Sequence, residues 1–537
     1  MTTIGEALIQ ELERRAVDCV FGIPGVHTIE MYRGLASSGI RHVTPRHEQG
    51  AAFMADGYAR ASGKPGVAFV ITGPGFTNTL TAMAQARADS VPMLVVSGVN
   101  ALDTLGRGLG HLHELPDQLG LSRSVALAAE RISCAADLIP ALERVFAAIT
   151  SARPGPVHIE LPLDVAGLPF EATAREPAPV QRRSVDTGAV ARAAELLNSA
   201  KQPVVLAGGG SIAAADKIRA LAERLDAPVV QTVNARGAMF GHPLGVPASP
   251  SLRSIRDLIA AADVVLALGT ELGPTDYDMY DDGNAARMQN LIRVDICGDQ
   301  LARHPAELPI QADATAFLGG VMDAVTPRSG DGAARAETAR TAARAEIGMD
   351  MGAAVDMLDA LRTALPNALS IGDSTQPIYA GNLYYDHDRP GGWFNSATGY
   401  GALGYGIPAA IGAAIAQPDV PVTCLVGDGG AQFSLPEVMT AVDESLPVVF
   451  IIWNSRGYLE IDRSMQAANV TVVGCDPTPP DFELTAKSFG VPYVSCALEP
   501  GDLTAALHRC REQNGPSVIE VRAYESYNSE QESTVNA

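Results

Sequence analysis

The chain has 537 residues, of which 47% are hydrophobic, and it carries a formal net charge of −22 at pH 7. That length is too great for one hydrophobic core and predicts about three to four domains. The acidic charge is spread along the chain, which argues against nucleic acid and anionic membrane surfaces as partners and is typical of a soluble acidic enzyme.

The cysteines and the N-terminus indicate a compartment. Seven scattered cysteines show no CxxC or Cys/His metal-binding spacing, as expected in a reducing environment. The first 15 residues have the pattern of an amphipathic helix and lack the apolar core of a signal peptide, and no apolar run is long enough to cross a membrane. We therefore expect a cytoplasmic protein.

The N-terminal region reads as alternating helices and strands. Helical spacing over 4–16 precedes a strand and turn at 17–25 and a short strand at 40–44. Glu48 then stands at the start of a helix that follows a strand, which places it at the carboxyl edge of a parallel sheet, where ligands bind. The plainer alternative is that Glu48 only complements the helix dipole.

A further strand over 92–97 leads toward a glycine-rich loop, GRGLGHLHELPDQ, at 106–118. This loop carries His111, His113, Glu114 and Gln118. Histidines in surface loops are commonly solvated, so the sequence leaves open whether His113 is catalytic.

The middle of the chain follows a linker at 166–187 that is rich in Pro, Ala and charge. Strands at 203–211, 226–232, 263–273 and 291–296 alternate with helices such as 213–225, which predicts a doubly wound parallel sheet. The GGG at 208–210 is a weak nucleotide signal, and we expect it to be structural. After the third of these strands lie five carboxylates, which form either a solvated loop or a site for a guanidinium group: Glu271, Asp276, Asp278, Asp281 and Asp282.

The C-terminal region follows a second expected linker at 327–346, with helix resuming by Ala353. A strand at 368–371 ends in the loop Gly372–Gln376, whose hydroxyls suit a diphosphate. Another strand at 420–426 breaks at Gly427-Asp428-Gly429-Gly430, where backbone N–H groups can converge on an anion.

A capping box predicts the next helix, because Ser434 is followed three residues later by Glu437; this helix should end near 445. A strand at 448–453 then delivers the turn 454–457 to the same sheet edge as Asp428. Carboxylate, amide or hydroxyl, and carbonyl oxygens around one point suit a hard cation, so magnesium diphosphate is the expected occupant. An ordinary turn with an N-capping Asp428 is the alternative.

These strings together resemble one enzyme superfamily. GIPG at 22–25, RHEQGAAFMADGYAR at 46–60, TGPGFTN at 72–78, TGYGALGYGIPAAIGAA at 398–414 and the GDG stretch are similar to the thiamine-diphosphate-dependent acetolactate synthases and 2-oxo acid decarboxylases, over about residues 1–525. The resemblance implies three doubly wound α/β domains with parallel sheets: a pyrimidine-binding domain at 1–170, a middle domain at 188–326 and a diphosphate-binding domain at 350–530.

The resemblance also implies roles for individual residues. Glu48 would hydrogen-bond N1′ of the aminopyrimidine, Leu403 would hold the cofactor bent, and His113 and Gln118 would face the substrate. The expected cofactor contacts are Gly25, Pro74, Ser374, Thr375, Gln376, Gly401, Leu403, Gly427, Gly429, Gly430 and Tyr458. The expected metal ligands are Asp428, Asn454, Ser455 and Gly457.

This sequence departs from the superfamily at the metal site. The superfamily's metal-binding asparagine falls on Ser455, while Asn454 occupies the preceding position. Either Ser455 supplies a hydroxyl, or the turn shifts so that Asn454 reaches the ion.

The resemblance implies an activity that uses thiamine diphosphate and Mg2+ on a small-molecule 2-oxo acid. HVTPRHEQG, GRGLGHLHELPDQ and ELGPTDYD look like the subgroup that decarboxylates 5-guanidino-2-oxopentanoate (2-ketoarginine) to an aldehyde and CO2. The alternatives are a carboligase that acts on pyruvate and, because of Ser455, a catalytically dead structural relative. A homodimer or homotetramer with shared active sites is expected, with Glu48 and Asp428 of one site coming from different chains.

Overall fold

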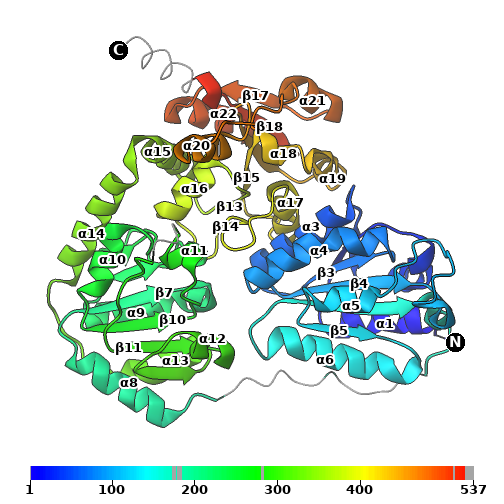
Figure 1. Ribbon diagram of the computed structural model, residues 1–537, viewed down its shortest axis with the longest axis horizontal. Helices are drawn as coiled ribbons and strands as arrows, with labels where there is room; N and C mark the ends of the chain where they lie inside the picture. Colours follow the sequence, from blue (N-terminus) through cyan, green and yellow to red (C-terminus); the bar gives the residue numbers. More distant parts are fainter. Residues whose placement is uncertain (1, 172–176, 178–183, 280–282, 512–513, 526–537) are drawn as a thin grey trace.

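The chain folds around three separate parallel sheets, each with helices on its faces (Figure 1). The computed structural model describes residues 2–171, 177, 184–279, 283–511 and 514–525. Each sheet has six strands, and every strand pair is parallel. The predicted fold class, three doubly wound α/β units, is confirmed.

The first sheet has the order β2-β1-β3-β4-β6-β5. Its strands are β1 (Cys19–Gly22), β2 (Arg41–Val43), β3 (Gly66–Val70), β4 (Met93–Val99), β5 (Ala128–Arg131) and β6 (Pro156–Pro162). Its main helices are α1 (Ile4–Arg14), α3 (Glu48–Ser62), α4 (Pro74–Ala88) and α6 (Leu138–Thr150). The residues of β3, β4 and β6 are buried throughout, as expected when helices cover both faces of a parallel sheet.

The second sheet has the order β12-β11-β10-β7-β8-β9. Its strands are β7 (Pro203–Ala207), β8 (Val229–Gln231), β9 (Gly245–Val246), β10 (Val264–Leu268), β11 (Leu291–Asp295) and β12 (Leu308–Gln311). The helices α8 (Thr187–Ser199), α9 (Ala215–Leu225), α10 (Arg253–Ala260) and α13 (Ala314–Val321) accompany it. This is the nucleotide-binding type of strand order, which reverses direction between β7 and β10.

The third sheet repeats the order of the first, as β14-β13-β15-β16-β18-β17. Its strands are β13 (Leu369–Gly372), β14 (Trp393–Asn395), β15 (Val422–Gly427), β16 (Val448–Trp453), β17 (Tyr493–Cys496) and β18 (Ser517–Val521). Around it lie α15 (Gly348–Ala364), α16 (Gln376–Leu383), α17 (Gly406–Ala416), α19 (Val438–Asp443), α20 (Leu459–Ala467), α21 (Phe482–Phe489) and α22 (Pro500–Arg511).

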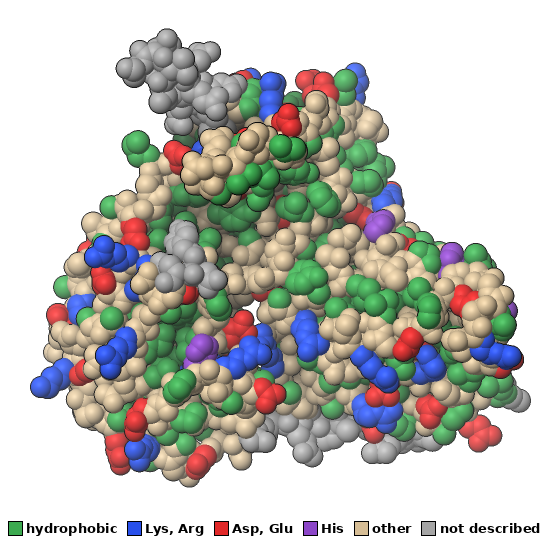
Figure 2. Space-filling view, in the orientation of Figure 1, with side chains coloured by type: hydrophobic (Ala, Val, Ile, Leu, Met, Phe, Trp, Pro, Cys, Tyr) green, Lys and Arg blue, Asp and Glu red, His purple; other side chains and the backbone are tan. Residues whose placement is uncertain are grey.

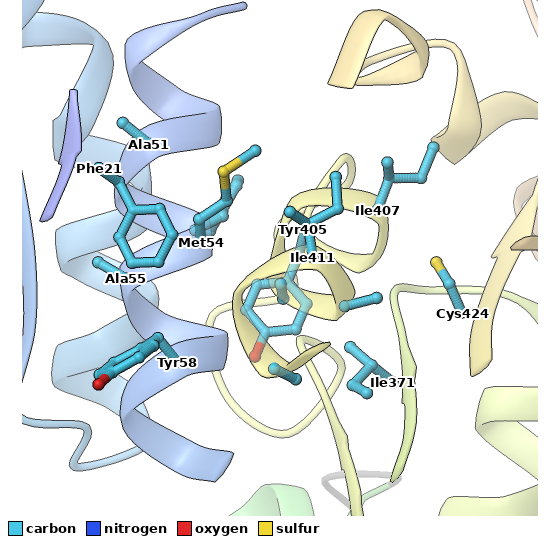
Figure 3. Packing of buried hydrophobic residues seen from close by; sticks show 14 of the residues in the cluster. Phe21, Ala51, Met54, Ala55, Tyr58, Ile371, Tyr405, Ile407, Ile411 and Cys424 are labelled. Carbon is cyan, nitrogen blue, oxygen red and sulfur yellow. The ribbon is translucent and has the colours of Figure 1, made fainter. Parts of the chain in front are cut away.

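Helices α3 and α17 join the first domain to the third (Figure 3). A Cβ on Gly57 would collide with the carbonyl of Ala409, and one on Gly412 would collide with that of Met54, so only glycine permits this crossing. The Tyr405 hydroxyl donates a 2.6 Å hydrogen bond to buried Asp56 across the interface. The two domains therefore share one continuous core.

The segment expected to be the second linker is largely helical. Helix α14 (Gly332–Glu346) occupies most of 327–346 and packs against α10. Three of its alanines, Ala336, Ala339 and Ala343, fall on one face and are buried. The expectation that helix would resume only by Ala353 was wrong, because this alanine stripe has a partner surface. Part of the first expected linker, 172–176 and 178–183, lies outside the described residues.

Over the ranges that the structure describes, no helix combines the length and the hydropathy of a membrane span.

Candidate active site

The carboxyl ends of β13 and β15 form a crevice at the point where the strand order of the third sheet reverses, the usual ligand position in such sheets. The loops that leave the two strands are in close contact. A Cβ on Gly430 would lie 2.8 Å from Oδ1 of Asp373, and one on Gly427 would lie 3.1 Å from Oγ1 of Thr375. Glycine at both positions thus allows the two loops to approach this closely.

Three oxygen-bearing groups that could ligate a metal ion meet beside this crevice. Oδ1 of Asp428 accepts hydrogen bonds from the backbone N–H and the hydroxyl of Ser455, at 3.1 and 3.2 Å. Oδ2 accepts one from the Gly457 N–H at 3.0 Å, and the Ser455 hydroxyl lies 3.1 Å from the Gly457 carbonyl oxygen. One carboxylate, one hydroxyl and one carbonyl form a donor set that suits a hard divalent cation. Burial raises the pKa of Asp428, as expected for a carboxylate placed where a cation would stabilise it.

Asn454 has other partners. Its Nδ2 donates to Oε1 of Glu520 at 2.7 Å, and its Oδ1 accepts from the Arg456 N–H at 2.9 Å. The side chain is only 4% exposed. The predicted ligands Asp428, Ser455 and Gly457 are therefore brought together, whereas the side chain of Asn454 is used to hold the turn.

The predicted capping box does not form. Ser434 makes no capping hydrogen bond, and a 3-10 turn at Leu435–Glu437 precedes α19, which ends at Asp443 instead of near 445. The Glu437 carboxylate instead accepts hydrogen bonds from the backbone N–H groups of Arg46 and His47, at 3.0–3.1 Å. Glu437 thereby fixes the start of α3, immediately before Glu48.

Glu48 is the first residue of α3 and is half-buried. Its Oε2 accepts a 2.9 Å hydrogen bond from Nδ2 of Asn78 on α4. Asn78 belongs to the TGPGFTN string, but no pattern in the sequence singled it out. The pairing leaves Oε1 of Glu48 for a ligand at the carboxyl edge of the first sheet.

Gln118 is almost completely buried, with 2% exposure. Its Oε1 accepts from the Thr72 hydroxyl and the Gly73 N–H, at 2.8 and 3.1 Å, and its Nε2 donates to the Ser97 hydroxyl at 3.0 Å. Gln118 therefore fastens the 106–118 loop to the ends of β3 and β4. Direct contact between Gln118 and a substrate stays a prediction.

His113 lies in the same loop and takes a positive φ of 60°. It is half-buried against Gly73, and its ring centroid is 5.7 Å from that of buried His27. Nε2 of His27 is 3.0 Å from Oδ1 of Asn100, whose Nδ2 donates to the Leu112 carbonyl at 3.3 Å. This chain of contacts holds His113 over the carboxyl end of β3, and His111 is exposed nearby.

The other predicted cofactor residues lie at the carboxyl edges of the first and third sheets. Gly25 follows β1, Pro74 is the first residue of α4, and Ser374, Thr375 and Gln376 follow β13. Gly401 (φ 76°) and half-buried Leu403 precede α17. The Tyr458 ring packs over Gly429, where a Cβ would lie 2.5 Å from the ring. Their contacts with a cofactor stay predictions.

Asp373 is a buried carboxyl that the sequence did not mark. It follows β13, and its Oδ2 accepts the Gly404 N–H at 2.9 Å while Oδ1 has no partner among the described residues. Burial raises its pKa to about 7. Asp373 thus anchors the loop that carries Leu403, and its position after a strand in the GDS string was the available signal.

The predicted acidic stretch divides between different environments. Glu271 pairs with Arg153 at 2.8 Å and lines a cavity between domains together with Asp276. Asp278 is buried and accepts the Gly283 N–H at 3.0 Å. Asp281 and Asp282 lie outside the described residues.

Comparison with known proteins agrees with this geometry. Residues 2–121, 190–321 and 371–521 match the thiamine pyrophosphate enzyme N-terminal TPP-binding, central and C-terminal TPP-binding domains, respectively. The chain is 41% identical to the probable 2-ketoarginine decarboxylase AruI of Pseudomonas aeruginosa, over 97% of this chain and 94% of that protein. It is 31% identical to the acetolactate synthase isozyme 1 large subunit of Escherichia coli, over 97% and 94%. The predicted resemblance is confirmed: the chain belongs to the thiamine pyrophosphate-dependent enzyme family.

Proposed function

We propose that this enzyme decarboxylates a cationic 2-oxo acid, 5-guanidino-2-oxopentanoate, to an aldehyde and CO2. The observation that carries the proposal is the oxygen set of Asp428, Ser455 and Gly457 beside the glycine-lined crevice, in a chain 41% identical to a probable 2-ketoarginine decarboxylase. Thiamine diphosphate, when bound, would supply the nucleophilic carbon and the electron sink that loss of CO2 requires. Mg2+, when bound, would supply the positive charge that balances its diphosphate.

The chain's own residues would hold the two ends of the cofactor. Asp428, the Ser455 hydroxyl and the Gly457 carbonyl would bind Mg2+. The carboxyl group of Glu48, oriented by Asn78, would share a proton with N1′ of the aminopyrimidine. Glu437 would keep this carboxyl in place through its bonds to the two preceding backbone N–H groups.

Ser455 is proposed as the metal ligand in preference to Asn454, because only its side chain lies among the other ligand oxygens. Ser455→Ala should weaken Mg2+-dependent cofactor binding about three- to tenfold, since one neutral donor is lost. Ser455→Asn should bind the cofactor at least as tightly as the unmodified enzyme. Calorimetric titration with Mg2+ and thiamine diphosphate measures both, and equal affinity in Ser455→Ala and the unmodified enzyme would favour Asn454.

Glu460 is proposed to pair with the guanidinium of the substrate. It lies in the first turn of α20, two residues after Tyr458. Its Oε1 is buried with no hydrogen-bond donor among the described residues, and it forms a long ion pair, of 3.8 Å, with Nη1 of Arg463. Its charge also acts on Tyr379, whose hydroxyl is hydrogen-bonded to Ser374 of the proposed diphosphate loop. Glu114 is less suited, because its carboxylate accepts the N–H groups of Leu109, Gly110 and His111.

The substrate experiment compares kcat/KM for 5-guanidino-2-oxopentanoate and for an uncharged 2-oxo acid of equal length. Glu460→Gln should lower the first by about ten- to hundredfold and leave the second unchanged, because only the cation uses the charge-assisted hydrogen bond. Glu483→Gln, which changes an exposed glutamate in the first turn of α21, is the control. Equal losses with both substrates would refute the role of Glu460.

Carboligation of pyruvate is the second candidate, favoured by the 31% identity to an acetolactate synthase. Both reactions release CO2, so the products must be identified. The decarboxylase proposal fails if pyruvate is the better substrate and two pyruvates are joined.

We further propose that the active site is shared between two chains of a homodimer or homotetramer. Large apolar side chains near the catalytic loops are strongly exposed in the single chain, which supports a covering partner. They include Val26 (55%), Leu112 (65%), Tyr400 (55%) and Phe433 (59%).

Mixing two inactive variants tests the shared site. We assume that Glu48 of one chain and Asp428 of another belong to the same active site. Glu48→Gln and Asp428→Ala chains refolded or co-expressed at equal amounts should then regain about a quarter of the activity of the unmodified enzyme. Variants mixed after separate purification, without subunit exchange, are the control. No regained activity in isolated mixed dimers would place each site within one chain.

A further inference from the structure

A cavity of about 470 Å3 lies where the three domains meet, well within the usual size of small-ligand pockets. On the middle domain, it is lined by residues that follow the carboxyl ends of β7, β10 and β11. On the first domain, it is lined by residues that precede β4 and β6, including Val91 and Pro154. Figure 2 shows a hollow between these domains with acidic and basic side chains at its rim.

The cavity is separate from the proposed catalytic edge of the first domain. Glu48 and the 72–74 turn follow strands of that sheet, whereas the cavity borders the opposite, amino-terminal edge. The cavity and the catalytic edge are therefore separated by the length of the strands of this sheet.

The wall of the cavity has more negative than positive charge. Its carboxylates are Asp89, Glu271, Asp276, Asp295 and Asp313, and its guanidinium groups are Arg60 and Arg153. Both arginines are already neutralised, since Arg60 binds Asp56 and Asp89 and Arg153 binds Glu271. Among the described residues, Asp276 and Asp295 form no ion pair, although Arg236 and Arg293 lie near enough to attract them without direct contact.

A third acceptor lines the cavity independently of these carboxylates. Gln300 is 3% exposed, and its Oε1 has no hydrogen-bond partner within the described part of the chain. A buried acceptor without a donor is costly, so a ligand that donates would relieve it.

Two glycines of the cavity, Gly208 and Gly210, already use their backbone N–H groups within the protein. The N–H groups of Gly208 and Gly210 donate to the carbonyls of Leu268 and Gly269, at 2.9 and 3.0 Å. They are therefore not available to a diphosphate, as they would be in a nucleotide-binding turn.

We propose that this cavity binds a small organic cation, a guanidinium or ammonium compound, between Asp276 and Asp295 with Gln300 as a further acceptor. The proposal does not depend on the reaction assigned above. It places a second, cation-selective site at the junction of the three domains, where occupancy would link the middle domain to both others.

The probe is agmatine, which carries both a guanidinium and an ammonium group, titrated calorimetrically into the intact protein without thiamine diphosphate. Agmatine should bind at one site per chain, and Asp276→Asn and Asp295→Asn should each weaken it about tenfold or more. Glu195→Gln, an exposed glutamate of α8, is the charge-matched control and should bind normally. Unchanged thermal unfolding of the two variants verifies that they fold.

Four outcomes would overturn the proposal. One is the absence of agmatine binding at millimolar concentrations, and another is equal affinity in the unmodified protein and both cavity variants. The third is binding of ADP, with a higher affinity in Asp276→Asn than in the unmodified protein. That result would assign the cavity to a nucleotide. Loss of agmatine binding in Glu460→Gln but not in Asp276→Asn would place the ligand in the catalytic site and would likewise refute it.

Discussion

The first and third sheets have the same strand order, yet they place their carboxylates differently. In the first sheet, the crevice between β1 and β3 is bordered by uncharged turns at 23–25 and 72–74, and Glu48 follows the edge strand β2. In the third sheet, Asp373 and Asp428 follow the two strands that flank the crevice. The shared topology thus places the ligand-binding edge alike in both sheets. Because the residues at that edge differ, we expect the two sheets to hold different parts of the cofactor.

The largest effect is expected from removing Asp428, the proposed metal-binding carboxylate of the third sheet. Asp428→Ala should abolish detectable Mg2+-dependent binding of thiamine diphosphate, and with it turnover, because the only charged ligand of the proposed site is lost. Calorimetry with and without Mg2+ measures this. Asp419→Ala changes an exposed aspartate before the same strand and should bind normally. Similar affinities in the two variants would show that the crevice carboxylate is not needed.

Changing the edge-strand carboxylate of the first sheet should separate binding from chemistry. Glu48→Gln should lower kcat by about 10²–10⁴-fold, since the amide cannot exchange a proton with N1′, and should leave cofactor affinity nearly intact. Asn78→Ala, which keeps the carboxyl but removes its 2.9 Å partner, should cause a smaller loss. Exchange of the thiazolium C2 proton, followed by NMR, is the direct readout, and normal exchange in Glu48→Gln would contradict the assignment.

The buried Asp373 has no counterpart at the end of β1. Its ionisation should lower the folding stability of the third domain in a pH-dependent way. Its pKa is raised from 3.8 to about 7 by burial, so the folded protein loses stability as pH rises from about 4 to 7. Asp373→Asn should therefore be neutral near pH 4 and stabilising above pH 7, by at most roughly 4 kcal/mol.

Urea unfolding of the cofactor-free protein at pH 5 and pH 8 measures this difference. Asp419→Asn, at an exposed site, should show none. A gain for Asp373→Asn that is the same at both pH values would show that the carboxyl does not titrate as expected.

The smallest effect concerns the packing of α3 against α17, which joins the first domain to the third. Gly412→Ala should destabilise the protein by about 1–3 kcal/mol, because the added methyl group collides with the Met54 carbonyl. Gly501→Ala, in the first turn of α22, meets no atom within 4 Å and should be neutral or slightly stabilising. Thermal unfolding compares them, and equal melting temperatures would mean that α3 and α17 separate easily.

Local patterns predicted the parts of this fold that depend on neighbours in the sequence. The strand expected at 448–453 is β16, and the run at 420–426 is nearly β15, because apolar runs between turn residues are typical of buried parallel strands. Likewise, the glycines at 427, 429 and 430 lie at a strand end where close approach requires them.

Predictions failed where a residue had a better partner far away in the sequence. Glu437 was expected to cap its own helix, but it binds backbone groups 391 residues away near Arg46. The alanine-rich segment that was expected to be a linker became α14 because α10 offers a surface for its alanine face. Such competition cannot be seen in a local window.

The sequence by itself determined the family, the three parallel sheets and the identity of the strand-end residues, because these follow from short-range patterns of apolar residues, glycines and carboxylates. Only the tertiary structure decided how those residues are used. It placed Ser455 with Asp428 while Glu520 holds Asn454, and it moved Glu271 and Asp276 into a cavity between domains. The physical reason is that each polar group takes the partner that the packed sheets bring within hydrogen-bond distance, and that choice is made between segments far apart in the chain.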